Sequence, residues 1–313
     1  MAVVPLPFDG GNTGRAGLDL GDAVVGRIVV CNVYKEGYTM PEFNAVENTL
    51  FIPMLGRIYA SEHFQNILYD EKAQSLKDML PKSLMETGSQ NQYTLLASAS
   101  RSANMDRYIR DFLRRKPDGI IAELGCGLET TFYRNDDGHT RWYAVDLPDV
   151  MEYRKTLLPE PERQTYFADD AFSDDWLRRI RIDAPDAPVL VTAGGLFHYF
   201  EEEKVLALLR MLRSFGNMEV VFDSVNKSGM GMLRKKYMKQ MGHADAGMFF
   251  YVDSASVLAG KIGSGVRVLA EEPYYRHIPR TGLKLSTKIS MSVSDRFCMV
   301  KMVHLCHSAK FHD

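Results

Sequence analysis

Two glycines separated by one residue follow a short apolar run and mark the first candidate site. Residues 120–124 are too few for a helix and largely apolar, so they predict a buried parallel strand. Gly125 and Gly127 come directly after it, and glycines let the backbone approach a ligand closely. Nucleotide-binding α/β folds have this strand and turn, with the ligand outside the carboxyl ends of the strands. The turn therefore predicts a site for an adenosine compound.

An acid beside the turn narrows the choice of ligand. Glu123 precedes the first glycine by two positions, and a carboxylate there suits an ammonium group but repels a pyrophosphate. Thr130 stands where a dinucleotide-binding turn has its third glycine. The turn therefore favours an adenosyl amino acid over a dinucleotide, and an NAD-dependent oxidoreductase is kept as the alternative.

Further acids follow two later predicted strands. Asp146 ends a strand at 141–146, at about the separation from the glycines that is expected of a ribose-binding carboxylate. Alternatively it caps a helix that Pro148 begins. Asp169 and Asp170 follow a strand at 164–168, where an acid can meet an adenine amino group, although they are also common capping residues. The order of these acids along the chain favours ligand binding over helix capping.

Strands and helices alternate after the glycine turn. Further strands are predicted at 188–193 and 218–223, with an amphipathic helix between them. This alternation predicts an α/β fold with a Rossmann-like, seven-stranded, mostly parallel sheet and helices on both faces. The last two strands are predicted at 266–270 and 296–305 with a long loop between them, which permits an antiparallel last strand.

The chain divides into three predicted parts. Residues 1–39 are predicted to be an N-terminal arm, rich in glycine and aspartate at its start. Residues 40–116 are predicted to be helical, with the clearest helix at 103–115. Residues 117–313 are predicted to form the ligand-binding domain, with a helical insertion near 228–242. The early helices and the insertion are expected to select the substrate.

Composition argues against several classes of function. The formal net charge of -2 disfavours a nucleic-acid partner. The four cysteines contain no CxxC pair, so they predict neither a disulfide framework nor a zinc site. The sequence has no apolar run long enough to span a bilayer, and its start lacks the order of a signal peptide. These features predict a cytoplasmic protein without a structural metal or a membrane partner, and they assign no oligomeric state.

Several segments together resemble a known family. The segments are 101–108, Glu-Leu-Gly-Cys-Gly-Leu-Glu-Thr at 123–130, Tyr-Ala-Val-Asp-Leu-Pro-Asp-Val at 143–150, 168–170, and a helical preface at 46–57. They resemble the class I S-adenosylmethionine-dependent methyltransferases of the leucine carboxyl methyltransferase family, and within it the polyketide O-methyltransferases of the tetracenomycin type. The resemblance covers the chain from about residue 40 onward.

The resemblance implies an S-adenosylmethionine-dependent O-methyltransferase. Its acceptor would be a hydroxyl or carboxyl of a small molecule, such as a polyketide-like aromatic. A protein carboxyl methyltransferase and a cofactor-binding module without catalysis are kept as alternatives. The implied cofactor contacts are Arg101 for the carboxylate, Glu123, Gly125 and Gly127 for the amino-acid part, Asp146 for the ribose, Asp169 and Asp170 for the adenine, and Leu147 and Ala193 beside them. An arginine suits the carboxylate because its planar fork can bind both oxygens, and a solvated helix charge is the alternative.

The residues after the fourth predicted strand are candidates for catalysis. A hydroxyl acceptor needs a group that takes its proton. His198 and Tyr199 come shortly after the fourth predicted strand and are the candidates for this role. Packing beneath the cofactor is the alternative for both. The family often has a glutamate followed by a glycine here, whereas this chain has Ala193, Gly194 and Gly195. Contacts that such a glutamate makes are therefore in question in this chain.

Overall fold

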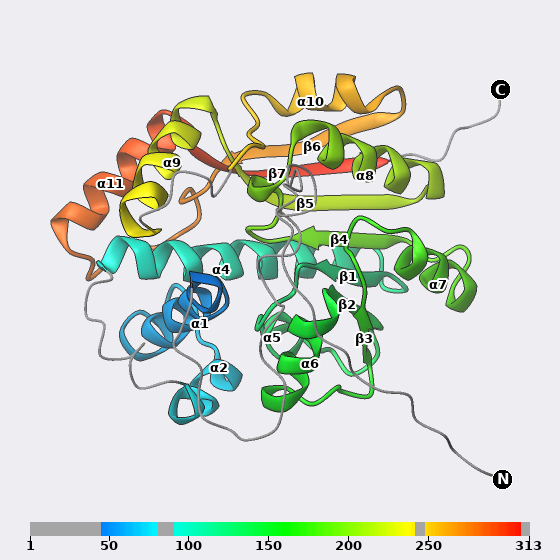
Figure 1. Cartoon of the computed structure of the whole chain (residues 1–313), viewed down its shortest axis with the longest axis horizontal. Helices are drawn as coiled ribbons and strands as arrows, with labels where there is room; N and C mark the ends of the chain where they lie inside the picture. Colours follow the sequence, from blue (N-terminus) through cyan, green and yellow to red (C-terminus); the bar gives the residue numbers. More distant parts are fainter. Residues whose placement is uncertain (1–44, 81–90, 242–247, 308–313) are drawn as a thin grey trace, which may run out of the picture. The chain divides into compact units, whose positions relative to one another are not determined.

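A computed structural model describes residues 45–80, 91–241 and 248–307 (Figure 1). The chain separates into a unit of residues 1–42, which lies outside the described residues, and a compact unit of residues 43–313. The predicted N-terminal arm therefore stays a prediction. Among the described helices, none has the length and apolar character needed to cross a membrane.

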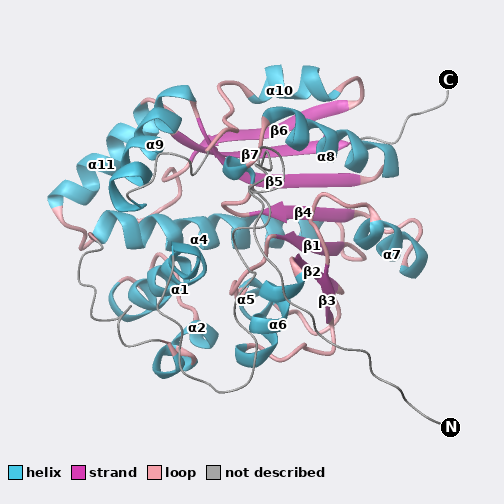
Figure 2. Ribbon diagram, viewed as in Figure 1, coloured by secondary structure: helices cyan, strands magenta, loops and turns pink. Residues whose placement is uncertain are grey.

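The described unit is built around one seven-stranded sheet (Figure 2). Its spatial order is β3-β2-β1-β4-β5-β7-β6. The strands are β1 (Ile120–Leu124), β2 (Trp142–Asp146), β3 (Gln164–Ala168), β4 (Val189–Ala193), β5 (Met218–Val225), β6 (Val266–Pro273) and β7 (Val300–His307). The first five strands pair in parallel, and β7 is antiparallel to both of its neighbours. The predicted Rossmann-like sheet with an antiparallel last strand is confirmed.

Burial along each strand follows its place in the sheet. Every residue of β1, β4 and β5 is buried, as expected of central strands covered by helices on both faces. The edge strands β3 and β6 instead alternate between covered and more exposed positions. The apolar runs that predicted the central strands therefore mark the middle of the sheet, where the glycine turn begins.

Helices cover both faces of the sheet. They are α1 (Ala45–His63), α2 (Glu71–Ser75), α4 (Gln92–Arg115), α5 (Thr131–Asn135), α6 (Pro148–Leu157), α7 (Asp175–Asp183), α8 (Glu202–Phe215), α9 (Lys227–Met241), α10 (Ala255–Ile262) and α11 (Leu285–Arg296), with short 3-10 turns η1 (Lys77–Met79) and η2 (Phe197–Tyr199). One core cluster packs α7, α8 and α10 on one face. A second packs α1, α4, α5 and α11 on the other face.

The helix predicted at 103–115 is longer than expected. Helix α4 begins at Gln92, after Asn91 accepts a hydrogen bond from the backbone N–H of Thr94 at 2.9 Å. Its first half contains many serine, threonine and alanine residues, whose weak hydrophobic contrast hid the helical period. As a consequence Arg101 lies within the helix rather than ahead of it.

The prediction of a long loop between the last two strands is wrong. Helix α11 (Leu285–Arg296) fills most of that segment, and β7 starts at Val300 rather than at 296. The buried residues of α11 are Thr287, Met291 and Ser294. Two of these three are small polar residues, so the buried face carried no apolar periodicity that could predict a helix.

Candidate functional site

The glycine turn joins β1 to the ends of the neighbouring strands. Gly125 has φ +62° and Gly127 has φ +44°, a region that other residues rarely adopt. The backbone N–H groups of Gly125 and Cys126 both donate to the carbonyl of Val145, at 2.9 and 3.3 Å. A Cβ atom at Gly125 would lie 2.7 Å from Leu196 Cδ1. The turn is therefore closely packed against the segment after β4.

Glu123 is a buried carboxylate beneath this turn. It is 6% exposed, and its Oε2 has no hydrogen-bond partner among the described residues. Burial, with repulsion from Glu129, raises the pKa of Glu123 to about 7, although Arg154 opposes the shift. A buried acceptor atom without a donor suits an ammonium group. The structure thus fits the amino end of an adenosyl amino acid here.

Asp146 ties the end of β2 to the glycine turn. Its two oxygens accept hydrogen bonds from the backbone N–H groups of Gly127 at 2.7 Å and Leu147 at 2.8 Å. Helix α6 starts at Pro148 with Leu147 as its N-terminal cap residue, and no side chain caps it. A carboxylate has further lone pairs, so Asp146 can still accept bonds from ribose hydroxyls. Leu147 is half-buried beside it.

Asp169 and Asp170 lie in a tight turn after β3. Asp169 accepts a hydrogen bond from the backbone N–H of Asp170 at 2.8 Å, and the hydroxyl of Ser173 also donates to it. Asp170 accepts from the backbone N–H of Phe172 at 3.0 Å. The backbone N–H of Asp169 donates to the carbonyl of Asp146 at 2.9 Å. The two predicted ligand segments therefore adjoin at one edge of the sheet.

Arg101 forms an ion pair that sequence reasoning missed. Its Nε donates to Asp223 Oδ2 at 3.0 Å, and Asp223 lies on β5 with 2% exposure. Burial alone would raise the pKa of Asp223, but the charge of Arg101 and the contact with His198 hold it below its usual range. Asp223 ended a predicted strand, as Asp146 does, and Glu123 lies one residue before the end of another. That position was the available signal.

The predicted catalytic residues lie beside this ion pair. Ala193 is fully buried at the end of β4, and η2 follows it. His198 is 6% exposed, with Nε2 at 3.5 Å from Asp223 Oδ2. Its Nδ1 has no hydrogen-bond partner among the described residues. Tyr199 is half-buried and packs against a cluster that includes Met230 of α9.

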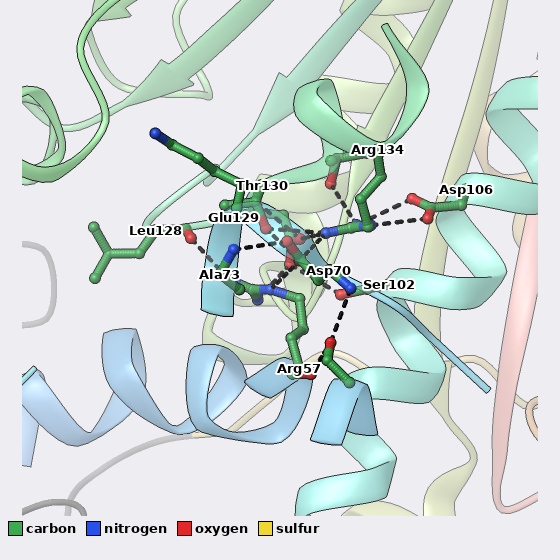
Figure 3. Close-up of polar contacts among 12 residues, drawn as sticks. Arg57, Asp70, Ala73, Ser102, Asp106, Leu128, Glu129, Thr130 and Arg134 are labelled. Carbon is green, nitrogen blue, oxygen red and sulfur yellow. Dashed lines mark hydrogen bonds and ion pairs between the residues drawn. The ribbon is translucent and has the colours of Figure 1, made fainter. Parts of the chain in front are cut away.

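A buried network of charges joins the early helices to the glycine turn (Figure 3). Arg57 of α1 donates to Glu129 at 2.8 Å and pairs with Asp70 at 3.2 Å. Arg134 of α5 contacts Asp70 and Glu129, and it binds both oxygens of Asp106 on α4 at 2.9 and 3.0 Å. The network fixes the segment after Gly127 from three helices.

Two more groups hold the same segment. The hydroxyl of Thr130 donates to Asp70 at 2.5 Å. Arg154 of α6 is fully buried and donates to the carbonyls of Gly127 at 2.8 Å and Glu129 at 2.7 Å. Thr130, which replaces the third glycine of a dinucleotide-binding turn, is therefore part of the packing that links the turn to α2.

Two solved structures are similar to this chain at low sequence identity. A methyltransferase from Thermobifida fusca, described as putative in its name, is 15% identical, and the match covers 85% of this chain and 99% of that chain at a TM-score of 0.49. A DUF574 family protein from Streptomyces avermitilis is 13% identical, with 81% and 97% covered and a TM-score of 0.49.

Sequence comparisons give closer relatives. The tetracenomycin polyketide synthesis O-methyltransferase TcmP of Streptomyces glaucescens is 33% identical over 127 residues. That match covers 40% of this chain and 46% of TcmP, so it spans less than half of that relative. A model of the leucine carboxyl methyltransferase family matches residues 53–213, just over half of the 313 residues. The resemblance drawn from the sequence is confirmed, and the chain belongs to the leucine carboxyl methyltransferase family.

Proposed function

We propose that this protein is an S-adenosylmethionine-dependent O-methyltransferase that acts on a hydroxyl or carboxyl of a small molecule. Family membership and the name of the relative TcmP support the reaction, and that name supports a polyketide-like aromatic acceptor. The observation that carries the proposal is the pair Glu123 and Arg101 at the carboxyl edge of the sheet. A buried acid and a partly exposed guanidinium at one edge suit the ammonium and carboxylate groups of one amino acid.

The remaining contacts follow from the strand ends. Asp146 would bind the ribose hydroxyls, since it is held by the turn that faces the same edge. Asp169 and Asp170 would border the adenine, with Leu147 and Ala193 completing its surroundings. The backbone of the glycine turn would approach the amino-acid part. These assignments predict that each substitution weakens cofactor binding.

The chemistry asked of the protein is mainly orientation. When bound, S-adenosylmethionine supplies a methyl group on a positively charged sulfur. The side chains of this chain hold the two reactants in line and exclude water. For a hydroxyl acceptor, Nδ1 of His198 would take the proton, because it is a buried nitrogen without a donor or acceptor among the described residues. A carboxyl acceptor is already ionised and needs no base.

The acceptor is proposed to lie between the sheet edge and the helices added to it. Leu50 of α1 approaches the turn, with its Cδ2 at 3.2 Å from where a Cβ of Gly127 would be. Tyr199 and the half-buried Leu233 of α9 pack against a cluster that contains Met230 of α9. Helix α9 covers most of residues 228–242, the segment proposed as a helical insertion. We propose α1 and α9 as the walls that select the acceptor.

The setting proposed for this reaction is the cytoplasm, with a small molecule as partner. The net charge of -2 disfavours a polyanionic substrate such as nucleic acid. A protein-directed carboxyl methyltransferase would need an extended surface for a peptide tail. Acceptor assays that include both a peptide with a free carboxyl end and small aromatics distinguish these two.

A methyl-transfer assay tests the proposal. The purified protein is incubated with S-adenosylmethionine and a panel of aromatic phenols, aromatic acids and carboxyl-terminal peptides, and products are followed by mass spectrometry. We expect methylated small aromatics and a parallel release of S-adenosylhomocysteine. Turnover of NADH without methyl transfer would contradict the proposal. Loss of hydroxyl but not carboxyl methylation in His198→Ala would support the role of His198.

A further inference from the structure

Asp223 contacts three different parts of the site. Its Oδ1 accepts a hydrogen bond from the backbone N–H of Gly195 at 2.6 Å, and its Oδ2 accepts one from Arg101. Nε2 of His198 lies 3.5 Å from the same Oδ2. Position 223 is one residue beyond the last paired position of β4 and β5, so the carboxylate stands at the carboxyl edge of the sheet.

The turn after β4 is shaped around the Arg101 side chain. A Cβ atom at Gly195, which has φ +71°, would lie 2.8 Å from Arg101 Cζ and Nη1. A Cβ atom at Gly194 would lie 3.1 Å from Arg101 Cδ. The guanidinium therefore lies against the backbone of these two glycines. Gly194 and Gly195 therefore make room for Arg101.

A similar cluster at the other end of the same elements supplies a comparison. Arg115 of α4 binds both oxygens of Glu219 on β5, at 2.8 and 2.7 Å, and His304 lies 2.7 Å from Glu219. Figure 1 shows α4 lying along β4 and β5, which it contacts. Both clusters therefore join an arginine of α4, an acid of β5 and a histidine, but Glu219 belongs to the opposite edge, at the start of β5.

We propose that Asp223 is a positioning residue, which fixes the Arg101 guanidinium for the cofactor's carboxylate and holds His198 beside it. This inference rests on the proposed function. With Nε bound by Asp223, the guanidinium is oriented and its terminal nitrogens are presented over Gly195. Because one carboxylate contacts both Arg101 and His198, the cofactor side and the acceptor side of the site share one anchor.

The test compares two ligands that differ in the part Arg101 would bind. S-adenosylhomocysteine carries the amino-acid group, whereas methylthioadenosine lacks it. Isothermal titration is performed on the wild type and on Asp223→Asn, with Glu219→Gln as the matched control from the same strand. We expect Asp223→Asn to weaken S-adenosylhomocysteine binding by about tenfold or more, as for loss of an oriented charged hydrogen bond, and to leave methylthioadenosine within about twofold. Glu219→Gln should change neither affinity, although it too removes a buried carboxylate.

Asp223→Glu keeps the charge and covers the case in which Asp223→Asn does not fold. It should weaken S-adenosylhomocysteine less than the Asn variant does and again spare methylthioadenosine. Equal weakening of both ligands, or no weakening of either, would overturn the role of Asp223 and leave the proposed function standing. If the wild type bound methylthioadenosine and S-adenosylhomocysteine equally, both the role of Asp223 and the proposed function would be contradicted. If it bound neither ligand, the proposed function itself would be refuted.

Discussion

Arg57 and Glu129 form a 2.8 Å hydrogen bond although 72 positions separate them along the chain. Arg57 is 1% exposed on the first described helix, and Glu129 follows the glycine turn. The same oxygen of Glu129 accepts a bond from Ser102 of α4 at 3.1 Å. The helical region before the sheet and the predicted cofactor turn are therefore joined by one carboxylate. Changes at Glu129 should affect folding and binding together.

Replacing Glu129 by Gln should destabilise the protein by about 2–4 kcal/mol, because Arg57 and Arg134 would keep buried charges with less compensation. Chemical denaturation at neutral pH measures this change. Arg178→Gln is the matched control, since it breaks an exposed pair with Asp174 and should leave stability nearly unchanged. Equal effects of the two substitutions would refute the importance of the network.

The same carboxylate predicts a dependence of stability on acid. Burial alone would raise the pKa of Glu129, but the charges of Arg57 and Arg134 outweigh it and lower the pKa to about 2. The folded protein then binds fewer protons at this residue than the unfolded chain between about pH 4.5 and pH 2. Stability from Glu129 is present above that window and is lost as the pH falls through it. Denaturation curves of Glu129→Gln should show a weaker loss over this range.

Cofactor binding should depend on pH through Glu123. Its pKa is raised to about 7 chiefly by burial, and an ammonium group beside it would favour the ionised form. Binding of S-adenosylhomocysteine should therefore release protons near pH 6.5 and tighten as the pH rises toward 8. Titration calorimetry in buffers of different ionisation enthalpy measures the released protons. In Glu123→Gln this proton release should disappear and the affinity should fall; unchanged release would rule out Glu123.

Glu123 should also lower the stability of the ligand-free protein at high pH. A folded pKa above the usual value means that the folded state binds more protons than the unfolded state between about pH 4.5 and pH 7. Stability then falls as the pH rises through this window. Glu123→Gln should be more stable than the wild type at pH 8, by up to about 3 kcal/mol, while binding the cofactor less well. Thermal unfolding of both proteins at pH 5 and pH 8 tests whether the wild type loses stability as the pH rises and whether Glu123→Gln is the more stable at pH 8.

The glycine turn predicts a steric effect. Gly125→Ala places a Cβ 2.7 Å from Leu196 Cδ1 at a positive φ. Left-handed backbone strain and overpacking together should lower the free energy of unfolding by about 1–3 kcal/mol. We also expect at least tenfold weaker cofactor binding. Gly260→Ala is the control: it lies in α10 with no atom within 4 Å of the added carbon. That variant should gain about 0.5–1 kcal/mol. Tight binding by Gly125→Ala would argue against ligand approach at the turn.

His307 provides a pH test away from the site. It is 1% exposed at the end of β7, and its ring nitrogens have no hydrogen-bond partner among the described residues. Burial, with a smaller effect of Arg213, lowers the pKa of His307 to about 4. The unfolded chain then binds more protons between about pH 6.5 and pH 4, so stability is lost as the pH falls through that window, by up to about 3 kcal/mol. His307→Leu should remove this part of the acid sensitivity, whereas His139→Gln, at an exposed position, should leave it unchanged.

The sequence predicted the elements whose signal is local. The apolar runs of the five parallel strands located each strand to within about two residues, because a buried strand is a continuous run of apolar residues along the chain. Helix α11 was missed because Thr287 and Ser294 form part of its buried face. Glu123, Asp146 and Asp169 were placed at strand ends, and the structure gathers these ends at one edge.

Contacts between segments far apart in the chain could not be predicted from the sequence. Asp223 was visible as the end of a strand, but its pairing with Arg101 spans 122 positions and depends on where α4 crosses the sheet. The contact of Arg57 with Glu129 likewise needs the packing of α1 and α4. Arg154 donates to two backbone carbonyls, and nothing in its neighbours along the chain predicts these contacts.

One titration tests the central claim that the sheet edge binds an adenosyl amino acid. Wild-type protein is titrated with S-adenosylhomocysteine, methylthioadenosine and NADH in a calorimeter at pH 7.5. The structure predicts that S-adenosylhomocysteine binds at one site per chain, and at least tenfold more tightly than methylthioadenosine because Glu123 and Arg101 recognise the amino-acid part. NADH should bind more weakly than either. Equal binding of the two adenosine thioethers, or a preference for NADH, would contradict the claim.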